Sequence, residues 1–278
     1  MLLKVKSNIK NHPLLYTLSY ILLYFLFIKF KKKGVYLFSD NGFIKASIKY
    51  SLYTVFNLIF GVITIKLISF FNVKKLGGFN INKVKHWELF IFPLYIIVIG
   101  ELLYPSYVLF SKISVLNWIV LIFWVFSIAF LEELMFRSFL QSVLIKKIAK
   151  NKKSLILCVL ASSIIFGLSH LIKYNQGYYG EMAQVLYSFF IGFLLGTLLL
   201  LTRKIWPSIL IHFLINIPSV LEIFVTEKSL LTKNGSNYTD VNDFIYLVVL
   251  TLPCFIYGMY FLIKLSQKEV NELISTSY

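Results

Sequence analysis

Charged residues are scarce in this chain of 278 residues: only 14% are Asp, Glu, Lys or Arg, whereas 58% are apolar. An average soluble domain has about 25% charged and about 45–50% apolar residues, so the composition excludes a soluble globular protein. Acidic residues are especially few, and the formal net charge is +16. This charge does not indicate a nucleic-acid partner, because nucleic-acid binders carry their Lys and Arg on a polar background. The composition predicts an integral membrane protein whose first partner is the lipid bilayer.

Cysteine is rare too, and several catalytic motifs are absent. The two cysteines, Cys158 and Cys254, both lie in apolar runs, which excludes a disulfide framework. The chain contains no His-Glu-x-x-His, no Gly-x-Gly-Asp and no Gly-x-Ser-x-Gly. These absences exclude the two-histidine zinc helix, the aspartyl intramembrane proteases and the serine nucleophile elbow. No internal repeat and no soluble domain is detectable.

Apolar runs, by contrast, fill most of the chain, and a helix that crosses a bilayer needs roughly 20 apolar residues. The sequence predicts an all-α polytopic membrane protein with about eight transmembrane helices in one bundle. We divide this single membrane domain into N-terminal spans (1–114), core spans (115–225) and a polar loop with the last span (226–278). The eight predicted spans are residues 13–28, 50–71, 89–110, 115–145, 154–172, 182–202, 205–225 and 244–263.

Two of these runs depart from a simple crossing. The run 50–71 is interrupted by Asn57 and Lys66, so it could instead lie in the membrane interface as an amphipathic helix. The run 115–145 is too long for a hydrocarbon core of about 30 Å at a rise of about 1.5 Å per residue. We therefore expect it to tilt or to project from the membrane.

The positions of the lysines predict the orientation, because cytoplasmic loops are enriched in Lys and Arg. Lysines gather between the second and third runs and between the fourth and fifth runs, and the opposite connections carry few. We expect the lysine-rich connections, and both termini if there are eight spans, to face the cytoplasm. The lysines between the first and second runs conflict with this scheme. The conflict disappears if 50–71 does not cross.

Ionisable and amide side chains inside the apolar runs are the candidate functional residues. An ionisable group in a membrane span costs at least a few kcal/mol and is by default a functional-site candidate. Three groups of such residues occur, each on a different run: Glu132, Glu133 and Arg137; His170; and His212 with Asn216.

The spacing within the first group predicts different roles for its two glutamates. Glu133 and Arg137 are four residues apart with the acid first, the favourable order for a helical ion pair. Glu132 is rotated by about 100° from Glu133 and cannot share this pairing equally. We expect Glu133 to be held ionised by Arg137, and Glu132 to face the bundle interior as a general base. A purely structural charge network is the alternative, although one glutamate would then be surplus.

The second and third groups add two imidazoles and an amide. His212 and Asn216 are four residues apart and share one helix face, which favours a shared site. The alternative role for these two residues and for His170 is hydrogen bonding between helices. With Glu132, these residues could do one of two things. Glu132, His170 and His212 could hold Zn²⁺ with an open coordination position. Alternatively, a Glu–His pair could activate water without a metal while the second His and the Asn stabilise the oxyanion.

Two glycines, Gly192 and Gly196, lie four residues apart in the run 182–202. Small residues at this spacing let membrane helices approach closely, so we interpret them as packing residues and not as chemistry. Trp206 and Pro207 open the run 205–225 as an interfacial anchor and a first-turn proline.

The three groups form motifs that resemble those of the CPBP family. This family comprises the CAAX prenyl endopeptidases and the bacteriocin-processing (Abi) intramembrane proteases. The resemblance covers roughly residues 115–225, and three motifs in order on three apolar runs are a specific signal. The motifs are Glu132-Glu133-x-x-x-Arg137, Phe166-x-x-x-His170 and His212-x-x-x-Asn216.

The resemblance implies an eight-helix bundle whose polar intramembrane cavity opens to the cytoplasmic side. It implies an endopeptidase that cleaves a membrane-associated or lipidated protein or peptide. Carried over to the matching positions, Glu132 would activate water with His170, while His212 and Asn216 would bind the oxyanion or complete a metal site. The family is usually labelled as metalloproteases, but a metal-independent glutamate mechanism has also been proposed for it. The resemblance leaves the need for Zn²⁺ open.

Within the same resemblance, Glu133 and Arg137 would be supporting residues, and no motif residue is missing.

A non-catalytic membrane scaffold or bacteriocin self-immunity protein with the same fold is the alternative function. A proton-relaying transporter is disfavoured because the chain lacks paired halves with broken helices. The composition suggests an AT-rich genome and so a bacterial plasma membrane. It predicts neither the substrate nor the oligomeric state.

Overall fold

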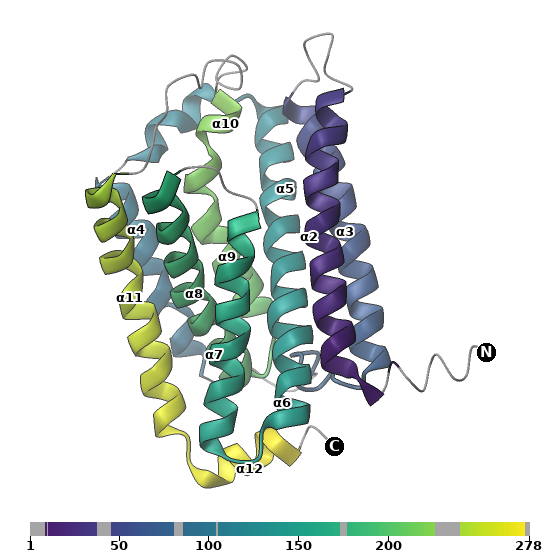
Figure 1. Cartoon of the computed structure of the whole chain (residues 1–278). Coiled ribbons are helices and arrows are strands. Elements are labelled where there is room, and N and C mark those ends of the chain that lie inside the picture. Colours follow the sequence, from purple (N-terminus) through teal and green to yellow (C-terminus); the bar gives the residue numbers. More distant parts are fainter. Residues whose placement is uncertain are drawn as a thin grey trace, which may run out of the picture.

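The structure, a computed structural model, describes residues 9, 11–37, 46–80, 86–103, 105–172, 177–225 and 240–275. These ranges form a bundle of helices (Figure 1), and the only strand-like pairing within them is one isolated bridge between Phe79 and Lys204. The predicted all-α membrane fold is confirmed. The main helices are α2 (Pro13–Leu37), α3 (Ala46–Phe70), α4 (Tyr95–Leu103), α5 (Val115–Glu133), α6 (Ser142–Ile148), α7 (Lys152–Ser169), α8 (Gly177–Thr202), α9 (Trp206–Asn216), α10 (Glu222–Val225), α11 (Val241–Lys264) and α12 (Gln267–Ser275).

Short turns of other helical types connect several of these elements. The segment between α5 and α6 is a π-helix, η4 (Leu134–Gln141), so that these three elements form one continuous rod. The remaining turns are 3₁₀ segments: η1 (Trp87–Phe90), η2 (Phe92–Leu94), η3 (Ser106–Lys112), η5 (His170–Ile172) and η6 (Pro218–Val220).

The predicted count of eight spans is not confirmed. Five helices in the described ranges are long and apolar enough to cross a membrane, or six if one bent pair counts as a single span. Two further predicted spans correspond to shorter apolar helices, at Pro13–Ile28 and Trp206–Asn216. The five candidate spans are Ser47–Phe70, Val115–Ile148, Lys152–Ile172, Tyr178–Thr202 and Val241–Lys264.

Proline explains why two of the predicted spans are broken. The predicted span 89–110 consists of separate pieces on either side of Pro105, and its two halves meet at an angle of 78°. The predicted span 205–225 ends as a regular helix at Asn216, where Pro218 starts a 3₁₀ turn. Proline has no N–H and clashes with the preceding turn, so an α-helix does not continue through it undisturbed.

The run 50–71 is helical and belongs to a candidate span. Its two polar interruptions have different surroundings. Asn57 is buried and donates a hydrogen bond from Nδ2 to Ser127 Oγ of α5, at 3.1 Å. Lys66 is exposed about one turn before the end of α3, where a long side chain can extend to the membrane surface. The helix is thus compatible with a crossing, and its polar residues are accommodated.

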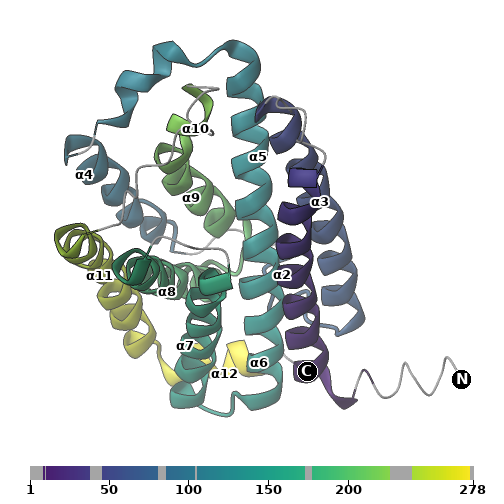
Figure 2. The same cartoon turned by 45° about the horizontal axis from the view of Figure 1, so that its top comes forward.

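Helices α2, α3 and α5 lie side by side, and α7, α8 and α11 form the other side of the bundle (Figure 1). Helix α9 lies between these two groups and packs on both α5 and α8 (Figure 2). Many large apolar side chains point outward, as expected for contact with lipid. On α11, for example, Val249, Ile256 and Ile263 are each more than half exposed.

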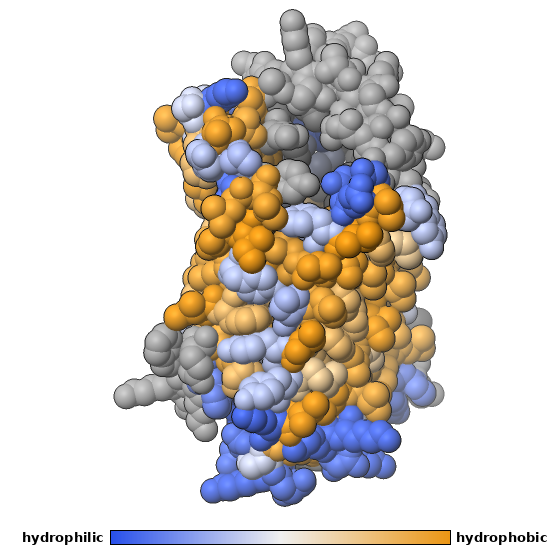
Figure 3. Space-filling view, turned by 90° about the vertical axis from the view of Figure 1, so that its left-hand side faces the viewer, coloured by the Kyte–Doolittle hydropathy of each residue, from blue (hydrophilic) through white to orange (hydrophobic). Residues whose placement is uncertain are grey.

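One end of the bundle is strongly basic. The end of α3, the connection between α6 and α7, the connection between α8 and α9, and α12 all meet there, at the bottom of Figure 1. Figure 3 shows the same polarity on the α11 side, where a hydrophobic band ends in a hydrophilic region. The lysine-rich connections that the sequence assigns to one side therefore lie together. Residues 38–45, part of the conflicting lysine-rich connection, and residues 226–239 of the predicted polar loop lie outside the described residues.

Glycine permits the closest helix contacts in the core. A Cβ atom at Gly196 of α8 would overlap Gln141 Oε1 of η4 and stand 3.1 Å from Val159 Cγ1 of α7. Gln141 in turn donates from Nε2 to the Gly196 carbonyl at 2.9 Å. The small residue at this position therefore lets a buried amide reach the backbone of α8.

We predict that Gly196→Ala destabilises the protein by about 1–3 kcal/mol, the usual cost of inserting a methyl group into a well-packed core. Thermal unfolding of the purified protein in detergent measures the effect. Gly100→Ala is the matched control, because a Cβ at Gly100 of α4 has no atom within 4 Å. Alanine is the better helix former by about 1 kcal/mol, so the control should be neutral or stabilising. Equal behaviour of the two variants would contradict the packing role of Gly196.

Candidate active site

The site begins where α5 changes into the π-helix η4. Glu132 and Glu133 are the last residues of α5, and Arg137 lies in η4. All three are buried, with exposed fractions of 3%, 0% and 1%. π-helical turns are rare, and many of them occur at functional sites. The three charges that the sequence places in a membrane span thus lie in the interior of the bundle and not on its lipid face.

Glu133 and Arg137 form the ion pair that their spacing predicts. Arg137 Nη1 lies 3.2 Å from Glu133 Oε1, and both side chains are buried. A buried charge without a partner is strongly unfavourable, whereas a close opposite charge offsets much of the desolvation cost. Each member of the pair is therefore required by the other.

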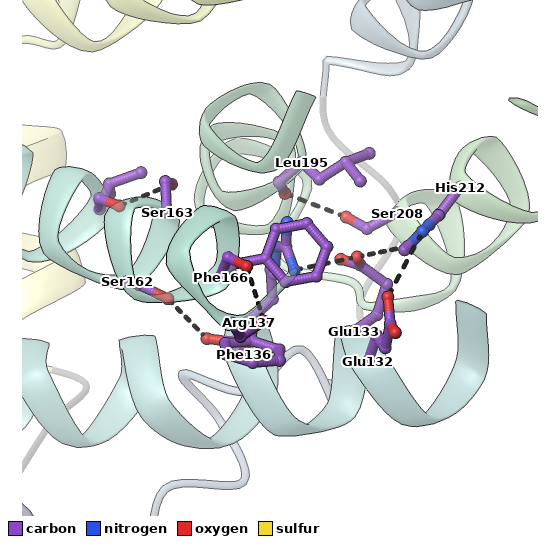
Figure 4. Close-up of polar contacts among 12 residues, drawn as sticks. Glu132, Glu133, Phe136, Arg137, Ser162, Ser163, Phe166, Leu195, Ser208 and His212 are labelled. Atoms are coloured by element: carbon purple, nitrogen blue, oxygen red, sulfur yellow. Dashed lines mark hydrogen bonds and ion pairs between the residues drawn. The ribbon is translucent and has the colours of Figure 1, made fainter. Parts of the chain in front are cut away.

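His212 of α9 lies between the two glutamates (Figure 4). Its Nδ1 is 2.9 Å from Glu133 Oε1, and its Nε2 is 3.8 Å from Glu132 Oε2. Because an ionised carboxylate only accepts hydrogen bonds, the proton of the short contact belongs to Nδ1. The Nε2 atom is then directed at Glu132. At 3.8 Å this second contact is too long for a direct hydrogen bond.

The Arg137 guanidinium lies over an aromatic ring on the next helix. Its Cζ lies 4.0 Å from the centre of the Phe166 ring of α7, a cation–π contact. On α8, a Cβ at Gly192 would come within 2.7 Å of Arg137 Nη2 and 2.9 Å of Phe166 Cδ1. Gly192 therefore leaves the space in which the guanidinium and the ring meet. Among the described residues neither Nη atom makes a hydrogen bond, so charge and ring contact hold this group.

His170 lies at the end of α7 and is buried. Its Nδ1 is 2.9 Å from the Phe166 carbonyl oxygen, which can only accept, so Nδ1 carries a proton. Its ring stands edge-on to Phe166, with 4.9 Å between the ring centres. The centre of the His212 ring is 6.1 Å from the same Phe166 ring. Phe166 therefore contacts both histidines, and the three motifs meet around it.

Asn216 occupies the last position of α9, one turn beyond His212. It is half-buried. Its carbonyl accepts a hydrogen bond from Ser219 Oγ at 2.8 Å, and its side-chain amide makes no hydrogen bond in the described part of the chain. The structure thus places Glu132, Glu133, Arg137 and His212 in one cluster. It does not draw the Asn216 side chain into that cluster.

Serine side chains form hydrogen bonds between the helices around the site, and the sequence did not predict these contacts. Ser162 of α7 donates to the Phe136 carbonyl at 2.8 Å, and Ser208 of α9 donates to the Leu195 carbonyl at 3.1 Å (Figure 4). Ser138 of η4 donates to the Gly77 carbonyl at 2.7 Å. The only available signal was the presence of Ser in apolar runs. Such residues are common in membrane helices, so the signal is weak.

The predicted zinc ligands were tested against this arrangement. Glu132 and His212 approach each other, but the described residues contain no group of three or more His, Cys, Asp and Glu side chains placed to hold a metal ion. His212 Nδ1 donates to Glu133, so Nε2 is the only nitrogen of this ring that could bind a metal. The residues therefore do not fit the three-ligand site predicted from Glu132, His170 and His212 in this geometry. The chemistry below is derived from the side chains alone.

The site is closed in this structure. Glu132, His170 and His212 have exposed fractions of 3%, 8% and 7%. Two pockets formed by the described residues, one beside Lys146 and one beside Tyr257, are lined by other residues. A peptide can reach Glu132 only if the surrounding side chains or helices move.

Comparison with known proteins finds a family match in the central segment of the chain. Residues 114–218 match the family described as type II CAAX prenyl endopeptidase Rce1-like. The matched segment contains all three motifs, so the resemblance predicted from them is confirmed. This is a protease family, and with the apolar helices it supports a protease embedded in a membrane. Comparisons with curated proteins and with solved structures gave no match.

We predict that Glu133→Gln destabilises the protein by about 3–5 kcal/mol, because it removes the carboxylate that is in contact with the buried Arg137 guanidinium. Thermal unfolding in detergent checks this. Glu272→Gln is the matched control: it removes the partly exposed ion pair between Glu272 and Arg203, with N···O at 3.3 Å. That loss should be at most about 1 kcal/mol. If the two variants unfold at the same temperature, the buried pair does not have the structural role assigned to it.

Proposed function

We propose that this protein is an intramembrane endopeptidase that hydrolyses a peptide bond in a membrane-associated or lipidated protein or peptide. The observation that carries the proposal is His212, which lies between Glu132 and Glu133 in a buried cluster within the segment that matches a protease family. A single Glu–Arg pair would satisfy a structural role. The second carboxylate, directed at an imidazole, is what hydrolysis requires.

Glu133 and Arg137 position His212 in this proposal. Arg137 pairs with Glu133, and Glu133 Oε1 accepts a hydrogen bond from His212 Nδ1. A carboxylate on one ring nitrogen fixes the tautomer and the orientation of the imidazole, as in catalytic triads. The neutral ring then presents the lone pair of Nε2 towards Glu132.

Glu132 and His212 together activate the attacking water. A polar contact longer than 3.5 Å often contains a bridging water, and the gap between Glu132 Oε2 and His212 Nε2 is 3.8 Å. A water held by both atoms loses one proton to Glu132 as its oxygen attacks the scissile carbonyl carbon. His212 Nε2 accepts a hydrogen bond from the second hydrogen of the water, which stays on the oxygen in the tetrahedral intermediate. General-base assistance of this kind contributes about 10²–10⁴-fold to rate.

His170 and Asn216 are assigned the remaining steps. Because Nδ1 of His170 donates to the Phe166 carbonyl, its neutral Nε2 is an acceptor. This atom can pass the proton that Glu132 took from the water to the leaving amine nitrogen as the C–N bond of the tetrahedral intermediate breaks. The Asn216 amide, one turn beyond His212, offers N–H donors to the carbonyl oxygen as it gains negative charge. The contact between Glu132 Oε2 and His212 Nε2 supports a part for His212 in activating the water, beside the pairing of Glu132 with His170 that the resemblance implies.

The position of the site indicates the class of substrate. Glu132 lies within the span Val115–Ile148, among helices that expose aliphatic side chains to lipid. Substrates held at the membrane therefore reach it most directly. The name of the matched family points to prenylated CAAX sequences as the first substrates to test. We place the protein in a bacterial plasma membrane with the lysine-rich end in the cytoplasm, as the positive-inside rule requires.

The test of the proposal is hydrolysis of a prenylated CAAX peptide by the full chain in proteoliposomes, with cleavage products identified by mass spectrometry. Glu132→Gln keeps the shape of the side chain but removes the base, so we expect activity to fall by about 10²–10⁴-fold. Glu272→Gln, at the exposed end of the bundle, is the control and should retain activity. A folded Glu132→Gln variant with normal turnover would overturn the assignment.

The same assay decides whether a metal takes part. Activity should survive treatment with a chelator, and metal analysis of the active protein should find less than one bound ion per chain. A stoichiometric metal whose removal abolishes hydrolysis would show that the ligands rearrange into a metal site. The proposed roles of Glu132 and His212 would then have to be replaced.

A further inference from the structure

A second site lies at the lysine-rich end of the bundle, away from the catalytic cluster. A pocket of about 150 Å³ is formed where α2 begins, α3 ends and α6 passes. Its volume is sufficient for a small polar group such as a phosphate, because one water occupies about 30 Å³ of liquid. Aromatic and aliphatic walls combine with an amide and two ammonium groups in its lining: Phe70, Phe71, Val143, Asn72, Lys146 and Lys147.

Lys146 is fixed in place at this pocket. Its Nζ donates to the Phe71 carbonyl at 3.2 Å and to the Asn72 carbonyl at 3.3 Å. These carbonyls belong to the end of α3, where cations are favourable because the last carbonyls of a helix lack partners. A capping role therefore accounts for Lys146 and holds a positive charge beside the pocket.

Lys147 has no such structural explanation. It is exposed, lines the same pocket, and pairs with no carboxylate in the described ranges. Lys74 and Lys75, which follow the pocket residues Asn72 and Val73, are exposed as well. These exposed ammonium groups make the surroundings of the pocket positively charged. The charge at the pocket is complementary to a phosphate.

The walls of the pocket distinguish between possible anions. Next to the pocket, towards the middle of the bundle, α2 exposes Leu15 and Leu18 and α3 exposes Val62 and Ile63. Lipid chains can contact these apolar side chains. The pocket therefore lies at the boundary between the hydrocarbon and the polar region. A free anion gains nothing from the apolar walls, whereas a phospholipid places its phosphate at the lysines and its glycerol and first methylenes against Phe70 and Phe71.

We propose that this pocket binds the headgroup of an anionic phospholipid. Lys146 and Lys147 provide the positive charge, and the Asn72 side chain provides an amide donor. Basic pockets between transmembrane helices are known to bind anionic headgroups. The binding would anchor the α2–α3 hairpin to α6, which continues into the π-helix that carries Arg137.

The experiment measures lipid retained by the full chain after purification from vesicles of phosphatidylcholine with phosphatidylglycerol, using native mass spectrometry. Lys147→Gln removes one charge at an exposed position and should lower retained phosphatidylglycerol about fivefold, the factor expected for one lysine at an anionic surface. Lys153→Gln is the matched control, because Lys153 is exposed at the same end but does not line the pocket. It should retain lipid like the unmodified chain.

Three results would overturn the proposal. An equal loss in both variants would show a diffuse attraction of the basic end and not a site. Unchanged retention in Lys147→Gln would show that the pocket is not the place of binding. Displacement of the lipid by inorganic phosphate at millimolar concentration would assign the pocket to a free anion. Vesicles of phosphatidylcholine alone, with or without added phosphate, are the control without anionic lipid and should give no retained lipid. This test does not require peptidase activity, so it stands apart from the proposed catalytic function.

Discussion

The buried ion pair between Glu133 and Arg137 is the constraint on which the rest of this structure depends. A carboxylate and a guanidinium with exposed fractions of 0% and 1% can coexist in an apolar bundle only if they remain in contact. That contact determines the position of His212, because its Nδ1 proton goes to the same carboxylate oxygen. It also fixes where Phe166 can lie, because the guanidinium packs on its ring. One charge pair thus brings residues of α5, η4, α7 and α9 into a single cluster.

The helices around the pair are adapted to its size. Gly192 has no Cβ that would overlap the Arg137 guanidinium. Gly196 likewise has no Cβ that would overlap the Gln141 amide, which donates to the Gly196 carbonyl. Serine hydroxyls close the remaining gaps by donating to carbonyls of neighbouring helices. In lipid there is no hydrophobic force between helices, so close packing and such hydrogen bonds hold the bundle together. The residues that build the site are therefore also the ones that fix the helix contacts.

Much of this arrangement could be predicted from the sequence. The low content of charge predicts a membrane protein, and in such a chain Glu132, Glu133 and Arg137 stand out because each would be costly without a partner. The spacing of Glu133 and Arg137 predicts their ion pair, which the structure contains. The motif order predicts the protease family that residues 114–218 match. These inferences succeed because they concern local spacing along one helix, or a pattern of residue types.

Contacts between helices could not be predicted in the same way. Spacing along α9 says that His212 and Asn216 share a face, but it does not say that His212 would lie between two glutamates. Likewise, nothing in the sequence distinguishes Phe166 from the other 26 phenylalanines as the ring that contacts Arg137 and both histidines. The predicted count of eight spans is not confirmed, and two of the predicted spans were counted across Pro105 and Pro218. These prolines interrupt helices without making them less apolar.

The central claim is that Glu133 fixes the tautomer of His212 and directs its Nε2 at Glu132. Nitrogen NMR of the folded protein with isotope-labelled histidine measures the protonation of each ring nitrogen directly. The chain has four histidines, and the His212→Gln variant identifies the signals of His212 by their loss. We expect Nδ1 of His212 to carry a proton whether the ring is neutral or charged. A neutral His212 with its proton on Nε2 and a bare Nδ1 would contradict this expectation.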